Sequence, residues 1–87
     1  MGEHVVYMLK CGDESYYTGY TTDLGRRIDE HRSGSGAKYT RGRGPLRVVH
    51  REAFDTQSAA LQREAAIKEL SHEQKACLVD AGESRPA

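Results

Sequence analysis

The sequence predicts an α/β (α+β) domain in which a small three-stranded mixed sheet is flanked by helices, in the order strand, strand, helix, strand, helix, helix. Apolar runs rich in β-branched and aromatic residues occur three times, and capping residues precede three stretches with helical patterning. A chain of 87 residues has room for one small domain. We expect its core at about residues 4–81 and a short tail at residues 82–87.

The first two strands are expected to form a hairpin. Val5–Leu9 (VVYML) is apolar, and Tyr16–Thr21 (YYTGYT) follows after five residues of turn composition, CGDES. Tyr7, Tyr17 and Gly19 all have odd numbers. Because side chains alternate along a strand, any register that pairs odd with odd positions places them on one face, where Gly19 leaves a hollow beside the tyrosines.

A helix is predicted over Leu24–Ser33, with Asp23 as its N-cap and Gly34 as its C-terminal stop. Arg27 and His31 are four residues apart, so both project from one face of this helix. Strand tyrosines, a glycine without a side chain and a cationic helix face together form a unit able to hold a phosphate.

The segment Ser33–Pro45 is glycine-rich and basic, and we expect a loop there. Leu46–Phe54 has the composition of a strand. Asp55–Thr56 can cap a helix that runs to about Leu70.

A final helix is expected over His72–Ala81. Ser71 and Gln74 have the spacing of a capping box at its start, and Gly82 is expected to end it.

The formal net charge is zero, but the middle of the chain is basic. Residues 26–51 contain two acidic residues against eight lysines and arginines: Arg26, Arg27, Arg32, Lys38, Arg41, Arg43, Arg47 and Arg51. A basic segment on a neutral protein is an electrostatic signal for a polyanionic partner. The alternative is a solvated surface over which these charges disperse on folding.

The composition, 37% hydrophobic and 30% charged, is that of a globular protein. Cys11 and Cys77 lack the spacing of zinc ligands, so we expect two free thiols in a reducing compartment, with a disulfide between them left open. No apolar run approaches the roughly 20 residues of a membrane span, and the N-terminus lacks the apolar stretch of a signal peptide. We therefore expect a cytoplasmic protein, and association with the nucleoid is compatible with this location.

Glu64 is unusual in the second predicted helix. At helical spacing it falls on one stripe with Ala60 and Ile67. A carboxylate in an apolar stripe is costly unless it is paired, hydrogen-bonded or bound to a metal. A salt bridge to Arg27, or exposure at the edge of the stripe, is the structural alternative to a metal site.

Taken together, these residues resemble the GIY-YIG nuclease family. The family's two name triplets correspond to Val5-Val6-Tyr7 and Tyr17-Thr18-Gly19, its helix arginine to Arg27, the residue one turn later to His31, and its metal-binding glutamate to Glu64. The resemblance covers about residues 5–70. It is strongest to the small stand-alone bacterial proteins called YhbQ-like, and the run from Gly36 to Arg43 is similar to one in those proteins.

The catalytic domain of Slx-type endonucleases is also similar, but this chain departs from family patterns. Val5 replaces the first glycine, and Tyr20 stands where repair enzymes often have lysine. The chain has no asparagine to match the late one that some members use, and the zinc domain of Slx-type enzymes is missing.

The resemblance implies a metal-dependent endonuclease that hydrolyses phosphodiesters in DNA, with DNA repair as its setting. One Mg²⁺ or Mn²⁺ ion would bind Glu64, Arg27 would contact the phosphate, and Tyr17 would position water or phosphate beside Gly19. Either Tyr7, which the family favours, or His31, whose ordinary pKa of about 6.5 is better suited, would be the general base. Nucleic-acid contacts are expected from Arg26, Lys38, Tyr39, Arg41 and Arg43.

Recognition of substrate structure rather than sequence is expected, because most of these cations lie in a loop or near strands. RNA instead of DNA, and a non-catalytic nucleic-acid-binding domain with a degenerate site, are the open alternatives. The sequence is also compatible with a protein partner that supplies substrate specificity. The protein itself is expected to be a monomer or a weak dimer.

Overall fold

The computed structural model describes residues 3–34, 40 and 42–83, with side chains to residue 80. It confirms the α+β class and the predicted order of elements. In chain order these are β1 (His4–Lys10), β2 (Tyr16–Thr21), α1 (Leu24–Ser33), β3 (Arg47–Phe54), α2 (Gln57–Lys68) and α3 (His72–Glu83). No helix among these residues is long and apolar enough to cross a membrane.

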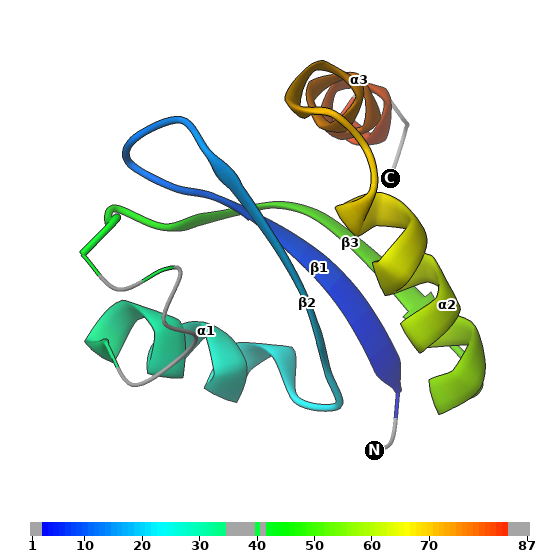
Figure 1. The fold of residues 1–87 in the computed structure, drawn as a ribbon. Helices are drawn as coiled ribbons and strands as arrows, with labels where there is room; N and C mark the ends of the chain where they lie inside the picture. The colour runs from blue at the N-terminus through cyan, green and yellow to red at the C-terminus, as the bar shows by residue number, and fades with distance from the viewer. Residues whose placement is uncertain (1–2, 35–39, 41, 84–87) are drawn as a thin grey trace.

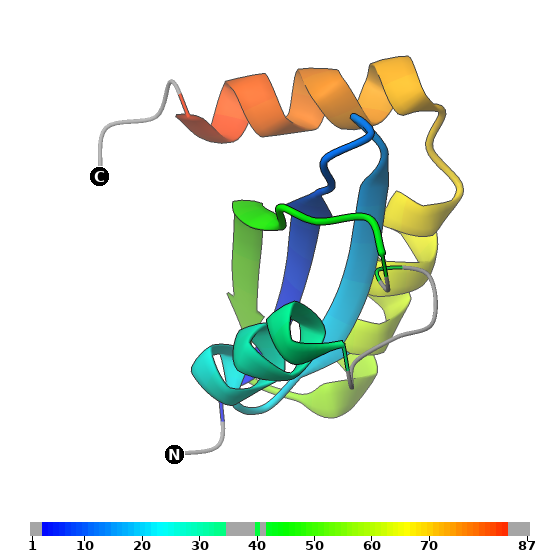
Figure 2. The same ribbon diagram turned by 90° about the vertical axis from the view of Figure 1, so that its left-hand side faces the viewer.

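The sheet is antiparallel throughout its described strands, so the expectation of a mixed sheet is wrong. Its order is β2-β1-β3, and β1 pairs antiparallel with both neighbours. After β2, the chain passes through α1 and crosses the sheet to the end at which β2 began (Figure 2). β3 therefore runs in the same direction as β2, and because β1 lies between them, no parallel pair forms.

Local capping explains where the helices begin. Asp23 Oδ1 accepts a hydrogen bond from the Arg26 N–H at 3.2 Å at the start of α1, and Thr56 Oγ1 accepts one from the Ala59 N–H at 3.1 Å at the start of α2. Gly34 ends α1 in the left-handed conformation, with φ of 87°. These three features were predicted.

The capping box before α3 is also confirmed. Ser71 Oγ accepts from the Gln74 N–H at 3.1 Å, and the Ser71 N–H donates to Gln74 Oε1 at 2.9 Å. The expected stop at Gly82 is wrong, because α3 continues to Glu83. A glycine within a helix costs about 1 kcal/mol relative to alanine, which is not enough to end a helix by itself.

Helices α2 and α3 lie on one side of the sheet and α1 on the other (Figure 1), and each face carries an apolar cluster. On one face, α2 and α3 cover Val6 and Met8 of β1. On the other face, α1 covers Tyr7 and Leu9. The alternation of β1 side chains thus separates a structural core under α2 and α3 from a tyrosine-bearing face under α1.

Candidate active site

The hairpin register brings Tyr7 and Gly19 together. Tyr7 pairs with Gly19 and Leu9 pairs with Tyr17, so odd positions meet odd positions, as predicted. A Cβ atom on Gly19 would lie 2.5 Å from Tyr7 Oη and 2.6 Å from Tyr7 Cζ. The hollow left by Gly19 is therefore filled by the Tyr7 ring, which lies across the neighbouring strand.

Gly19→Ala is expected to lower the free energy of unfolding by about 1–3 kcal/mol, because the new methyl group must displace the buried Tyr7 ring. Gly25→Ala is the matched control, since a Cβ there meets nothing within 4 Å on the exposed side of α1. It should raise the free energy of unfolding by about 0.5–1 kcal/mol. Urea denaturation measures both, and equal effects would contradict the close contact at Gly19.

His31 lies inside this face of the protein and not on the surface of the helix. Its side chain is 2% exposed, and its Nε2 lies 2.8 Å from Tyr7 Oη. The His31 ring also makes edge contacts with both tyrosines, at centroid distances of 5.8 Å to Tyr7 and 5.2 Å to Tyr17. Helix α1 thus places an imidazole between the two tyrosines and in a hydrogen bond with one of them.

Burial, followed by the positive charge of Arg27, lowers the pKa of His31 below its ordinary value of about 6.5. The unfolded chain therefore takes up this proton first as the pH falls. We expect the histidine's contribution to stability to be complete above pH 6.5 and to be lost as the pH falls through the lower pKa of the folded state. The free energy of unfolding of the wild type, measured against that of His31→Gln across this range, tests the sign.

A positive charge is held beside the tyrosines by Arg27. Its Nη1 donates to Glu30 Oε1 at 3.0 Å, and this bond, followed by hydrogen bonding with Tyr7, raises the pKa of Arg27. In turn, hydrogen bonding from Arg27 lowers the pKa of Tyr7, but burial has the larger effect and raises it to about 12. Tyr7 is therefore a neutral phenol at physiological pH, with Arg27 and His31 both at its oxygen.

Glu64 lies on α2, between the fully buried Ala60 and Ile67, as the predicted stripe requires. Its side chain is 17% exposed, and its carboxylate pairs with Lys68 Nζ at 3.3 Å. The expected alternative partner, Arg27, pairs instead with Glu30. The negative charge of Glu64 also raises the pKa of Tyr7, although burial, Arg27 and Tyr17 each affect that pKa more strongly. The carboxylate is therefore linked electrostatically to the tyrosine site.

The residues present fit a hard divalent cation. No group of three or more His, Cys, Asp or Glu side chains among the described residues could hold a metal ion. Mg²⁺ does not need such a cage, since it keeps several waters and takes one or two carboxylates plus substrate phosphate. Glu64, whose partly exposed carboxylate acts electrostatically on Tyr7, is the residue that would hold it.

The structure describes only some of the residues that are predicted to contact nucleic acid. Arg26 is exposed on α1 and forms an ion pair with Glu30 at 3.4 Å. Arg43 forms an ion pair with Asp13 in the β1–β2 turn. Lys38, Tyr39 and Arg41 lie outside the described residues, so their predicted contacts remain predictions.

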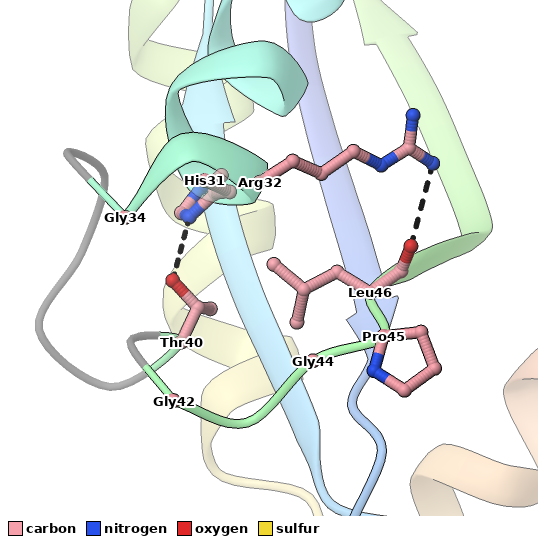
Figure 3. A pocket seen from close by; sticks show the side chains of 8 residues that line it. All are labelled: His31, Arg32, Gly34, Thr40, Gly42, Gly44, Pro45 and Leu46. Carbon is pink, nitrogen blue, oxygen red and sulfur yellow. Dashed lines mark hydrogen bonds between the residues drawn. The ribbon is translucent and has the colours of Figure 1, made fainter.

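Thr40 is a site residue that the sequence analysis missed. It is 2% exposed, and its Oγ1 lies 2.9 Å from His31 Nδ1. Figure 3 shows Thr40 pointing at His31 from the segment that precedes β3. A small polar residue in a glycine-rich run gives no signal of burial, so sequence alone could not identify it.

Glu52 of β3 lies in a hydrogen-bonded cluster with Arg63 and His50. It accepts hydrogen bonds from Arg63 Nε at 3.0 Å and Arg63 Nη2 at 3.1 Å, and His50 Nε2 lies 2.7 Å from Glu52 Oε2. Burial opposes ionisation, but the bonds to Arg63 and His50 lower the pKa of Glu52 overall. This cluster joins β3 to α2 on the face opposite Tyr7.

Paired strand tyrosines under a helix that carries arginine and histidine, with a glutamate on a later helix, are the arrangement of one nuclease class. The family model described as the GIY-YIG catalytic domain matches residues 3–76. The chain therefore belongs to the GIY-YIG catalytic-domain family, which implies a nuclease, with DNA as the substrate that the family suggests and a divalent metal as its general requirement.

Its relatives are small UPF0213 proteins, in agreement with the resemblance to stand-alone YhbQ-like members. The UPF0213 protein of Haloquadratum walsbyi is 58% identical over 79 residues, which are 91% of this chain and 89% of the relative. The UPF0213 protein of Staphylococcus saprophyticus is 48% identical over 82 residues, which are 94% of this chain and all of the relative.

Two solution NMR structures are similar along nearly their whole length. The UPF0213 protein from Bacillus halodurans is 52% identical, with a TM-score of 0.62 and coverage of 94% of this chain and 88% of that one. A protein from E. faecalis is 41% identical, with a TM-score of 0.66 and coverage of 100% and 96%.

Proposed function

We propose that this protein is a metal-dependent endonuclease that hydrolyses phosphodiester bonds in DNA and is directed by the structure of its substrate rather than by sequence. The observation that carries the proposal is the buried hydrogen bond between Tyr7 Oη and His31 Nε2, at an oxygen on which the positive charge of Arg27 acts. This arrangement couples a proton acceptor to a fixed positive charge, and hydrolysis of a phosphodiester needs both.

The geometry supports a division of work between Tyr7 and His31. With a pKa of about 12, Tyr7 does not supply a ready phenolate at neutral pH. Its oxygen can accept a proton from the attacking water while its own proton passes to the neutral His31 at Nε2. In this scheme His31 is the final proton acceptor and Tyr7 the group that touches water, which combines the two candidate bases in one path.

Arg27 would bind the non-bridging oxygens of the scissile phosphate, because its guanidinium is already oriented by Glu30 and Tyr7. Tyr17, on the same face, would position water or phosphate. A single divalent ion at Glu64, Mg²⁺ or Mn²⁺, would polarise the phosphate and stabilise the leaving oxygen. Cations on α1 and in the loop before β3 would contact the phosphate backbone, which carries no sequence information.

The direct test is cleavage of branched, flapped, duplex and single-stranded DNA, and of single-stranded RNA, with Mg²⁺, with Mn²⁺ and with a chelator. We expect metal-dependent cleavage that is fastest on a branched or flapped DNA. Cleavage that persists in the chelator would contradict the role of the metal, and equal rates on all shapes would contradict the structural preference.

A non-catalytic nucleic-acid binder is the second candidate, favoured by the pairing of Glu64 with Lys68. Both candidates predict binding that weakens steeply with salt through counterion release. Salt-dependent binding of these DNAs without cleavage under any metal condition would select this candidate.

A further inference from the structure

We infer that Thr40 is a positioning residue, whose hydroxyl holds the His31 imidazole in the tautomer that leaves Nε2 unprotonated toward Tyr7. Its consequence for turnover rests on the proposed nuclease function, whereas the tautomer itself is a property of the folded protein.

The two hydroxyl groups lie at opposite nitrogens of the same ring. His31 Nε2 is 2.8 Å from Tyr7 Oη, and His31 Nδ1 is 2.9 Å from Thr40 Oγ1. All three side chains are at most 2% exposed. His31, Thr40 and Leu46 are among the residues that line a pocket of about 150 Å³. Figure 3 shows the bond between His31 and Thr40 among these residues. The imidazole is therefore held from both sides and not by its own helix alone.

The direction of each bond follows from what the partners can donate. Burial and the charge of Arg27 favour a neutral imidazole, which carries a single N–H. The positive charge of Arg27 acts on Tyr7 Oη, so the lone pairs of this oxygen face Arg27 and its proton points to His31 Nε2. The remaining imidazole proton is then on Nδ1, which donates to Thr40 Oγ1.

A threonine hydroxyl is well suited to this task. It accepts from Nδ1 without adding a negative charge, so it stabilises the Nδ1-protonated tautomer that the Tyr7 proton favours, while leaving the imidazole neutral. Without this acceptor, water from the adjoining pocket could either donate to Nδ1 or accept from it. The ring would then lose the preference for a proton on Nδ1, and His31 Nε2 would spend time protonated and unable to accept from Tyr7.

The experiment compares wild type with Thr40→Val, which removes the hydroxyl at similar volume, and with Thr40→Ser, which keeps it. Long-range ¹H–¹⁵N NMR spectra of the metal-free protein report which nitrogen of His31 carries the proton. We expect the proton on Nδ1 in wild type and Thr40→Ser, and a mixed or Nε2-protonated ring in Thr40→Val. Thr40→Ala is the second hydroxyl-free variant if valine disturbs folding, which the amide spectrum shows directly.

An unchanged Nδ1-protonated ring in the hydroxyl-free variants would overturn the inference, as would failure of Thr40→Ser to restore it. With flapped DNA and Mg²⁺, the kcat of Thr40→Val should fall by about 10–100-fold, the range found for groups that orient a functional histidine. KM should stay constant. If wild type cleaves no substrate, the proposed function fails, but the NMR comparison still decides the role of Thr40.

Discussion

Arg27→Ala is expected to slow cleavage of DNA by about 10²–10³-fold, the usual effect of removing one preorganised donor that stabilises developing negative charge. The Arg27 side chain is 32% exposed, which leaves it accessible to a phosphate, while Glu30 holds its guanidinium in place. Single-turnover rates on a flapped DNA with Mg²⁺ measure the effect. Arg27→Lys should recover only part of the rate, because an ammonium group lacks the bidentate donor geometry.

The control for Arg27 is Lys75→Ala, which removes one positive charge from α3, outside the site. It should cleave at the wild-type rate. Wild-type turnover by Arg27→Ala would contradict the assigned role, and an equal loss in both variants would indicate a general effect of charge.

Glu64→Gln is expected to reduce Mg²⁺-dependent cleavage to background, because it removes the charged oxygen ligand at nearly constant volume. A second readout does not depend on turnover. Since the negative charge of Glu64 raises the pKa of Tyr7, the variant should titrate Tyr7 at a lower pH than wild type. Ultraviolet difference titration of the phenol in the metal-free protein measures this shift.

Glu69→Gln is the matched control on the same helix, where Glu69 is exposed and occupies the C-cap of α2. It should leave both cleavage and the Tyr7 titration at wild-type values. Full metal-dependent activity in Glu64→Gln would show that this carboxylate does not hold the ion. An unchanged Tyr7 titration would contradict the electrostatic link between the carboxylate and the tyrosine.

Local signals predicted most of the framework. The bounds of β2 and α1 agree with prediction at both ends, because strand composition, the Asp23 cap and the left-handed Gly34 act within a few residues. The capping box at Ser71 was predicted for the same reason. The antiparallel pairing of β3 with β1 was not predicted, because it depends on the end of the sheet at which β3 begins.

The candidate site residues were chosen from the sequence, but their environment could not be predicted from it. His31 was a candidate from its spacing, yet its burial and its contacts with Tyr7 and Thr40 depend on three segments that are distant in the chain. Burial raises the pKa of Tyr7 more strongly than Arg27 lowers it. Desolvation depends on how many atoms surround a group, which spacing does not reveal.

The sequence by itself thus determined the order of elements, the shared face of Tyr7 and Gly19, and the stripe that carries Glu64, because alternation and helical periodicity follow from backbone geometry alone. Tertiary structure decided that Tyr7 and Thr40 both meet His31. Such contacts join groups whose distance is set by packing of the whole chain, and the same packing sets the dielectric environment in which their charges act.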